Sequence, residues 1–294
     1  MRLTLLGTQG WIPTGRRETN CFAVEAGKNL LIFDAGTGLR RLLEPPASNM
    51  LSAATELHLF ITHYHLDHVC GLAYLPGVFA GRRLTVHVPE ASPSGADPKS
   101  GVTELIRKPY DPKPWDAQDN FELVTEVLHA GVNEIAGHEL RVRRQKHSDA
   151  SVGYRLDDAF AFCTDTIADE ATAEFARGAE LLLHEAFIDG IEETQPDKQQ
   201  LVQTTYAAHT SARQAAHLAV QAGVNELLLV HLNPLFDENY YQQMARSARS
   251  LGANAQVQPD LYSRELPDGW ARARRAKPAA AQQTRQTRRG SRRV

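Results

Sequence analysis

The segment HYHLDH, residues 63–68, places three histidines and one aspartate within six residues, directly after the apolar run Leu57–Ile61. Imidazole and carboxylate are the usual ligands of zinc and related divalent ions, and several ligands on one tight loop lower the entropic cost of assembling a site. A solvated polar loop is the alternative, but the apolar flanks that would hold this segment rigid favour a metal site. Two histidines can point to one centre while the last two residues turn toward a second; the candidates are His63, His65, Asp67 and His68.

Four ligands do not close two metal sites, so further ligands must come from other parts of the chain. A lone histidine is more often a hydrogen-bonded structural residue than a ligand. Three candidates, however, each follow a predicted strand: His147 after 140–144, Asp165 after 160–163 and His231 after 227–230. Strand ends are rigid places for ligands, so these three residues are predicted to complete the centre.

The elements that must position these residues form a mixed pattern. Short apolar runs separated by Gly, Pro and Asn predict strands in the first half of the chain and again at 123–127, 140–144, 151–156 and 160–163. Helices are predicted at 38–44, 211–222 and 239–251, with Gly223 as a helix C-cap. No repeat and no linker interrupt the pattern, so one α/β domain is expected over residues 1–271.

Composition is that of a soluble globular protein. The chain has 294 residues, of which 42% are apolar and 23% charged. No apolar run approaches the roughly 18 residues of a membrane span, and the N-terminus does not read as a secretory signal. Three cysteines without CxxC spacing make a disulfide framework unexpected. A cytoplasmic protein with no membrane contact is therefore expected.

The charge is unevenly distributed. Residues 272–294 hold nine of the 32 Lys and Arg residues and no acidic residue, so the remainder of the chain is acidic. This segment is poor in large apolar side chains and is predicted to be a disordered basic tail. The tail could be a solubilising extension or a weak arm for nucleic acid.

The order of these motifs resembles that of the metallo-β-lactamase superfamily. The residues that carry the resemblance are the HxHxDH segment at 63–68, then His147, Asp165 and His231, and the earlier run LLIFDAG at 30–36. The resemblance implies a four-layer αββα sandwich that binds two divalent metal ions, zinc first and manganese as the alternative. It assigns His63, His65 and His147 to one ion and Asp67, His68 and His231 to the other, with Asp165 bridging. Asp34 would support the ligand loop, residues 63–68, rather than bind metal.

A second set of residues resembles the ribonuclease Z-like phosphodiesterases of this superfamily. The run LLLHEAF at 181–187 is followed by His-Thr-Ser at 209–211, where these enzymes more commonly have His-Ser-Thr. By this resemblance, Glu185 pairs with His209. A carboxylate beside an imidazole favours the protonated ring, which can then act as an acid or as a partner for phosphate. The alternative is that Ser211 caps a helix and His209 is exposed.

The resemblance implies hydrolysis of a phosphodiester by metal-activated water, with His209 and Glu185 acting on the leaving group and Asp67 as ligand or base. Transfer-RNA-processing members carry a long arm between the positions of His147 and Asp165, but only 17 residues separate them here. An acidic body also opposes a long nucleic-acid footprint. A small phosphodiester such as a cyclic nucleotide is therefore expected, with an RNA-processing endonuclease of the ribonuclease Z type as the alternative.

Three other functions remain open. A thioester or lactam hydrolase would share the ligand loop but lack the Glu185–His209 pair. A diiron redox protein would usually have a carboxylate in place of His65. A non-catalytic binding module is disfavoured because the ligand set is complete.

Many relatives form homodimers, so a homodimer is expected by resemblance. Tyr110 and Trp115, in the Pro-rich loop at 89–120, could stack on a base or only pin that loop.

Overall fold

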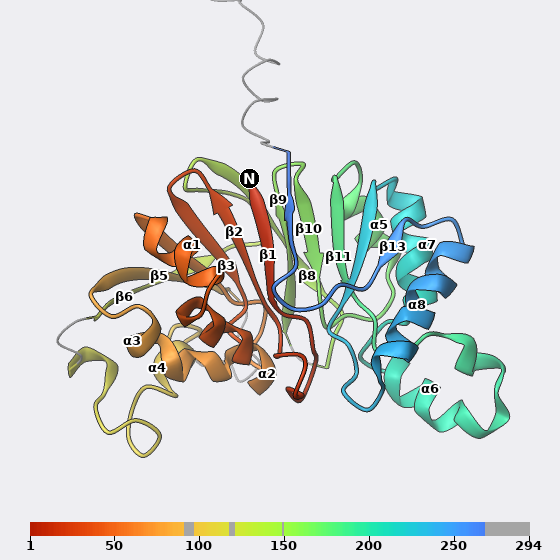
Figure 1. The fold of residues 1–294 in the computed structure, drawn as a ribbon, viewed down its shortest axis with the longest axis horizontal. Coiled ribbons are helices and arrows are strands. Elements are labelled where there is room, and N and C mark those ends of the chain that lie inside the picture. The colour runs from red at the N-terminus through yellow and green to blue at the C-terminus, as the bar shows by residue number, and fades with distance from the viewer. Residues whose placement is uncertain (91–96, 118–120, 149, 268–294) are drawn as a thin grey trace, which may run out of the picture.

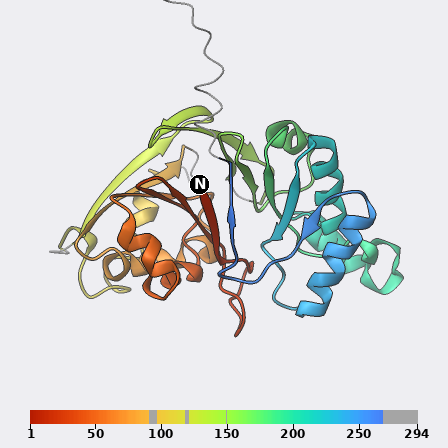
Figure 2. The same cartoon turned by 45° about the horizontal axis from the view of Figure 1, so that its top comes forward.

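The computed structural model describes residues 1–90, 97–117, 121–148 and 150–267. The basic tail predicted at 272–294 lies outside these residues, as do parts of the loop at 89–120. The chain forms two seven-stranded sheets that face each other, with helices on the outer side of each (Figures 1 and 2). The predicted αββα sandwich is confirmed.

The first sheet is built mainly from the N-terminal half of the chain. In spatial order it contains β14 (Ser263–Glu265), β1 (Arg2–Gly7), β2 (Cys21–Ala26), β3 (Asn29–Phe33), β4 (Glu56–Phe60), β5 (Arg82–Pro89) and β6 (Phe121–Leu128). The strands from β3 to β6 run parallel to one another. The helices of this half are η1 (Thr37–Leu43), α1 (Ala47–Ala53), α2 (Leu66–Val69), η2 (Cys70–Tyr74), α3 (Leu75–Val78), α4 (Ser100–Thr103) and η3 (Trp115–Ala117).

The second sheet comes from the C-terminal half. Its order is β13 (Ala255–Gln256), β12 (Glu226–Val230), β11 (Leu181–Glu185), β10 (Phe160–Cys163), β9 (Ser151–Leu156), β8 (His138–Gln145) and β7 (Gly131–Ile135). Strands β10 to β13 are parallel. The helices are α5 (Glu170–Ala176), η4 (Ile191–Thr194), η5 (Pro196–Lys198), α6 (Gln199–Tyr206), α7 (Ala212–Ala222) and α8 (Glu238–Ser250).

Side chains that alternate in direction along the central strands explain why each sheet is covered on both faces. In β4, Leu57 and Leu59 pack toward the helices of the first half, whereas Phe60 points between the sheets. In β12, Leu228 lies between the sheets while its neighbour Leu229 packs against the outer helices. Because successive side chains of a strand point to opposite faces, apolar residues at consecutive positions bury both faces of each sheet.

Most predicted elements are found, but the helix expected at 38–44 is a 3-10 helix at Thr37–Leu43 and is followed by α1. Pro46 precedes the first residue of α1, where a missing N–H removes no hydrogen bond from the helix. The two prolines that follow residue 44 are expected from the sequence to end the helical segment, but Pro46 is instead the N-cap of a second helix.

Candidate metal centre

The candidate centre lies where parallel strands of both sheets end. Segment 63–68 follows β4, Asp165 follows β10, and His231 follows β12. His147 comes shortly after β8. Residues that are distant in the chain meet here because the carboxyl ends of the parallel strands share one edge of the sandwich.

The structure brings together all seven side chains that the sequence analysis selected, in two groups. His63, His65, His147 and Asp165 form one set of potential ligand atoms that all lie within 4.8 Å of one another. Asp67, His68 and His231 form the second set by the same criterion. The grouping matches the one that the family resemblance implies, and it suits two neighbouring cations.

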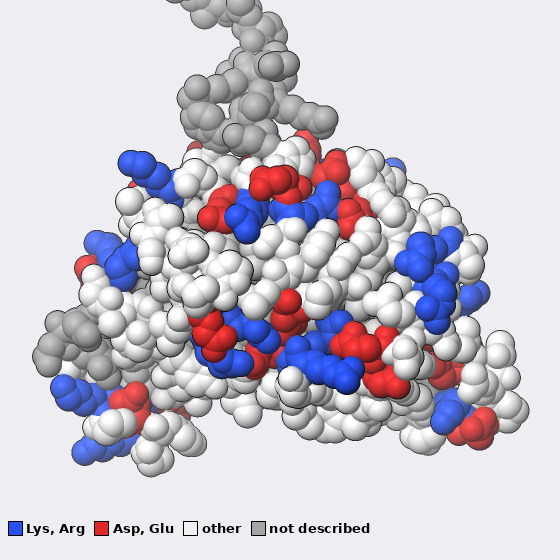
Figure 3. All heavy atoms as spheres, in the orientation of Figure 1, with Lys and Arg blue, Asp and Glu red and all other residues white. Residues whose placement is uncertain are grey.

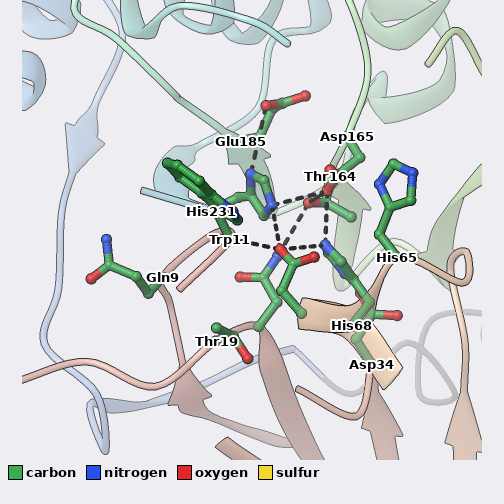
Figure 4. A network of polar contacts seen from close by, with 12 residues as sticks. Gln9, Trp11, Thr19, Asp34, His65, His68, Thr164, Asp165, Glu185 and His231 are labelled. Atoms are coloured by element: carbon green, nitrogen blue, oxygen red, sulfur yellow. Dashed lines mark hydrogen bonds and ion pairs between the residues drawn. The ribbon is translucent and has the colours of Figure 1, made fainter. Parts of the chain in front are cut away.

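Asp165 lies between the two groups and directs one carboxylate oxygen to each. Its Oδ1 lies 3.7 Å from His63 Nε2 and 3.6 Å from His147 Nε2. Its Oδ2 lies 3.1 Å from His68 Nε2 and 3.3 Å from His231 Nε2. Figure 4 shows Asp165, His68 and His231 pointing toward one another from different elements. This arrangement is the one expected of a bridging carboxylate.

Hydrogen bonds outside the cluster fix which ring nitrogen faces inward. His68 Nδ1 lies 2.8 Å from Asp34 Oδ2, and His147 Nδ1 lies 2.8 Å from the Ala208 carbonyl oxygen. Asp34 also accepts hydrogen bonds from the backbone N–H and the hydroxyl of Thr62 at 2.8 and 3.0 Å. Such partners orient imidazole ligands and raise their basicity. Asp34 therefore supports the ligand loop, as expected.

Unpaired buried nitrogens show that the residues fit a metal. The Nε2 atom of His63 is buried and has no hydrogen-bond partner, and that of His68 faces the Asp165 and Asp67 carboxylates at 3.1 and 3.4 Å without a well-aligned hydrogen bond. A buried polar atom without a partner costs free energy, typically about 1–3 kcal/mol. Inward-facing imidazoles grouped with carboxylates are the donor set that zinc and manganese accept. A divalent cation in each group would give these nitrogens a partner.

The electrostatics of the cluster favour charged forms. Burial alone would raise the pKa of Asp67, but His68 and His231 outweigh it and hold the pKa well below its usual value. Burial alone would lower the pKa of His68, but Asp165, Asp67 and Asp34 outweigh it and raise the pKa. In the metal-free protein, positive histidine and negative aspartate therefore stabilise each other where cations would bind.

Glu185 and His209 form a pair beside the centre, as the family resemblance implied. Glu185 is fully buried at the end of β11, and its Oε2 lies 2.8 Å from His209 Nδ1. Burial lowers the pKa of His209, but Glu185 outweighs this effect and raises the pKa to about 9. His209 is also grouped with Asp165 and His231 as a potential ligand set. A protonated ring beside the cluster can donate a proton or pair with an anion.

Ser211 and His209 each have a role, so the two interpretations of this segment do not exclude each other. Ser211 caps α7 in a capping box with Gln214. The Thr210 hydroxyl donates a hydrogen bond to the Thr166 carbonyl oxygen at 2.6 Å. His209 is thereby held at the cluster and is not simply exposed.

Phe187 was missed by sequence reasoning. Its ring stacks on the His209 imidazole at a centroid distance of 4.5 Å and an interplanar angle of 13°. It is the second residue after Glu185, and nothing in its spacing distinguishes it from a core residue. The contact holds the imidazole plane in place opposite its carboxylate partner.

The loop after β1 was also missed, although it touches two proposed ligands. A Cβ on Gly10 would lie 2.6–2.7 Å from three atoms of the His231 ring, so only glycine fits there. The backbone N–H of Trp11 donates a hydrogen bond to Asp67 Oδ2 at 2.7 Å. No periodicity or metal-ligand spacing marks this loop in the sequence.

Backbone strain is concentrated at this centre. Of seven described non-glycine residues with positive φ, four belong to it: Trp11, Asp34, Asp165 and His231. Each such residue costs of order 1–3 kcal/mol and persists only when its surroundings impose it. Strained residues that cluster in this way are typical of functional sites.

The Pro-rich loop at 97–117 is fixed to the ligand loop. Tyr64 donates its hydroxyl proton to the Pro98 carbonyl oxygen, and the ring leaves no room for a Cβ on Gly101. Tyr110 and Trp115 are 68% and 37% exposed. The loop is thus held by Tyr64, and both roles considered for Tyr110 and Trp115, stacking on a base and pinning the loop, stay predictions.

Comparison with known proteins places these features in a family. A model described as a β-lactamase superfamily domain matches residues 29–232. The ribonuclease Z of Haloarcula marismortui is 26% identical over 79% of this chain and 86% of its own length. The ribonuclease Z of Mycobacterium avium is 28% identical over 89% of this chain and 97% of its own length.

Solved structures show the same fold. The metallo-β-lactamase fold protein YhfI from Bacillus subtilis has a TM-score of 0.66 at 17% identity, covering 90% of this chain and 98% of its own. Yeast PDE1 has a TM-score of 0.66 at 13% identity, with the same coverage. A diphosphatase from the PhnP family has a TM-score of 0.62 at 16% identity, again covering 90% and 98%.

Proposed function

This chain belongs to the metallo-β-lactamase superfamily, in its ribonuclease Z-like branch, and is a metal-dependent hydrolase; we propose that it cleaves phosphodiester bonds in RNA. The observation that carries the proposal is the Glu185–His209 pair beside the two metal groups, by which we mean His63, His65, His147 and Asp165 as the first and Asp67, His68 and His231 as the second. Curated relatives named ribonuclease Z align over most of the chain. These relatives favour the RNA-processing alternative over the cyclic nucleotide that the sequence analysis expected.

We assign the metal ligands as the two groups described above, with Asp165 shared. Two divalent ions, when bound there, would supply Lewis acidity toward the phosphate oxygens. The imidazole and carboxylate donors suit zinc or manganese, and we propose zinc. Asp67 is assigned as a ligand because its carboxylate is grouped with His68 and His231, and its Oδ2 lies 3.2 Å from His231 Nε2.

His209 is proposed as the acid for the leaving group. Its Nδ1–H is directed at Glu185, so Nε2 is the nitrogen left to act on a substrate. A protonated Nε2 can pair with the phosphate and give its proton to the departing alkoxide. Glu185 keeps the ring charged and oriented, and Phe187 holds its plane.

A small phosphodiester is the second candidate substrate, and the β9–β10 connection favours it. Only residues 157–159 join these strands, so no clamping arm is present between His147 and Asp165 in the part of this segment that the structure describes. On the face drawn in Figure 3, basic and acidic side chains alternate and form no continuous basic track. RNA binding through many phosphate contacts would need such a track on some face.

The test compares precursor transfer RNA with a 3′ trailer, 2′,3′- and 3′,5′-cyclic nucleotides and bis(p-nitrophenyl) phosphate. Zinc- or manganese-loaded protein should cleave a phosphodiester, and a chelator should abolish the activity. His209→Ala should lower kcat at least about 100-fold while metal content is kept. His217→Ala, an exposed histidine on α7, is the matched control.

The outcomes separate the candidates. Cleavage of the RNA supports the main proposal, whereas cleavage of the cyclic nucleotides alone supports the small phosphodiester. Full activity of His209→Ala toward a thioester or lactam, with no phosphodiester cleavage, would overturn both.

The homodimer, the cytoplasmic location and the 1–271 domain boundary expected from the sequence stay predictions. Among the described residues, no helix has the length and apolarity that a membrane span needs.

A further inference from the structure

Trp11 occupies an unusual backbone position beside the metal groups. Its φ is 60°, and the N–H of Ile12 donates to the Gly10 carbonyl oxygen at 2.7 Å. A hydrogen bond between residues i and i+2 around a residue with positive φ is the pattern of the γ-turn that is rare and strained. A bulky residue is seldom found there, because the left-handed region crowds its Cβ.

Contacts on both sides impose this conformation. Before Trp11, Gly10 packs against the His231 ring and donates its N–H to the Leu232 carbonyl oxygen at 2.9 Å. At Trp11, the N–H reaches Asp67 Oδ2 at 2.7 Å. The turn is thus tied to two residues of the second metal group, and Trp11 lies at the margin of the network in Figure 4.

The indole of Trp11 buries only part of its surface in the folded protein. Trp11 is 55% exposed, although its backbone touches a cluster whose histidines are largely buried. A large aromatic ring left in water forgoes the burial that would otherwise offset backbone strain. Strain and exposure together, next to a reactive centre, indicate that the ring serves a ligand rather than the core.

We propose that Trp11 is a specificity-determining residue whose indole stacks on the nucleobase next to the scissile phosphate. This inference rests on the proposed phosphodiesterase activity and adds the substrate feature that is recognised. The backbone of Trp11 contacts Asp67, so its ring lies within the reach of a nucleoside whose phosphate occupies the metal groups. Stacking tolerates every base, since each has a π-face, and the turn fixes the backbone position from which the ring projects.

The test uses two substrates with the same leaving group, thymidine 5′-(p-nitrophenyl phosphate) and methyl p-nitrophenyl phosphate. The ratio of their kcat/KM values reports base recognition separately from catalysis. Trp11→Ala should lower this ratio about 5- to 150-fold, the range expected for the loss of one aromatic–base stack. Trp11→Phe should keep most of it, because a smaller ring still stacks.

Trp115→Ala is the matched control, since it removes a partly exposed tryptophan from the loop fixed to Tyr64. The ratio should be unchanged in this variant. If the ratio of kcat/KM values fell in Trp115→Ala and did not change in Trp11→Ala, the proposal would be overturned and the base would lie against the Pro-rich loop. An unchanged ratio in both variants would overturn it as well.

A binding measurement separates failure of this inference from failure of the proposed activity. If neither substrate is hydrolysed, the proposed activity is refuted. Calorimetric titration of the metal-loaded protein with AMP and with ribose 5-phosphate would still measure whether the base adds to the binding affinity. Trp11→Ala should weaken the binding of AMP about 5- to 150-fold and that of ribose 5-phosphate less. Equal weakening of both ligands, or of neither, would refute stacking by Trp11.

Discussion

His68 Nδ1 lies 2.8 Å from Asp34 Oδ2, and neither side chain is exposed to solvent. Asp34 directly follows β3, whereas His68 lies on α2 after the adjacent strand β4, so the contact links the ends of two parallel strands. Because the pair fixes His68 with Nε2 facing Asp165, the carboxylate sets the geometry of the second metal group without joining it.

Asp34→Asn should therefore weaken metal binding about 10- to 100-fold, the usual effect of losing a partner of a ligand imidazole. Competition with a chromogenic chelator measures this affinity. Asp157→Asn is the matched control, because Asp157 makes the same 2.8 Å contact with His138 away from the cluster. Equal metal affinity in the two variants would contradict the role given to Asp34.

Gly10→Ala should impair the centre without unfolding the protein. The added Cβ would lie 2.6–2.7 Å from the His231 ring, so the ring must move from its place beside Asp165. We expect loss of about one metal ion per chain, measured by elemental analysis, with the circular dichroism spectrum preserved. Gly15→Ala, where a Cβ meets no atom within 4 Å, should keep full metal content.

The pKa of His209 should depend on Glu185 in the metal-free protein. NMR titration should give about 9 in the parent chain. Glu185→Gln should lower the pKa toward the ordinary imidazole value of about 6.5, because burial is then opposed only by the smaller contributions of Asp165 and Asp67. Glu174→Gln, an exposed carboxylate, should change nothing.

The sign of the stability effect follows from the raised pKa of His209. The charged ring stabilises the folded state fully below about pH 6.5. This contribution is lost as the pH rises through about 9. Denaturant unfolding of the metal-free protein at several pH values should show the loss, and a Glu185→Gln variant with the same pH dependence would argue against the pair as its source.

Metal loading should release protons at neutral pH. Asp165, Asp67 and Asp34 outweigh burial and raise the pKa of His68, so its ring is protonated before metal binds. A ligand imidazole must be neutral at the coordinating nitrogen, so the proton leaves on binding. Calorimetric titration with zinc in buffers of different ionisation enthalpy measures this release. A heat that does not vary with the buffer would show that His68 is neutral beforehand.

The sequence allowed the local part of the site to be predicted, because its signals are short-range. His63 to His68 lie in one short segment, and Asp165 and His231 each follow a short apolar run that is typical of a buried strand. Parallel strands bring such ends together, so convergence followed once the fold was inferred. Glu185 and His209 were identified through the family resemblance.

The remaining part depends on long-range packing that leaves no pattern in the sequence. Gly10 and Trp11 have no ligand chemistry, and their proximity to His231 and Asp67 comes from a loop that crosses between the two halves. Helix α6 was not predicted, because its Gln- and Thr-rich sequence carries only a weak apolar stripe.

The proposed ligands come from both halves of the sandwich, with segment 63–68 following the first sheet and His147, Asp165 and His231 following the second. Coordination would therefore act as a reversible cross-link between the halves. A ligand that binds only the folded state adds stability in proportion to the logarithm of its free concentration. The resistance of this protein to unfolding would then track the supply of free metal in its surroundings, and starvation for metal would loosen the contact between the two halves before it disturbed the interior of either.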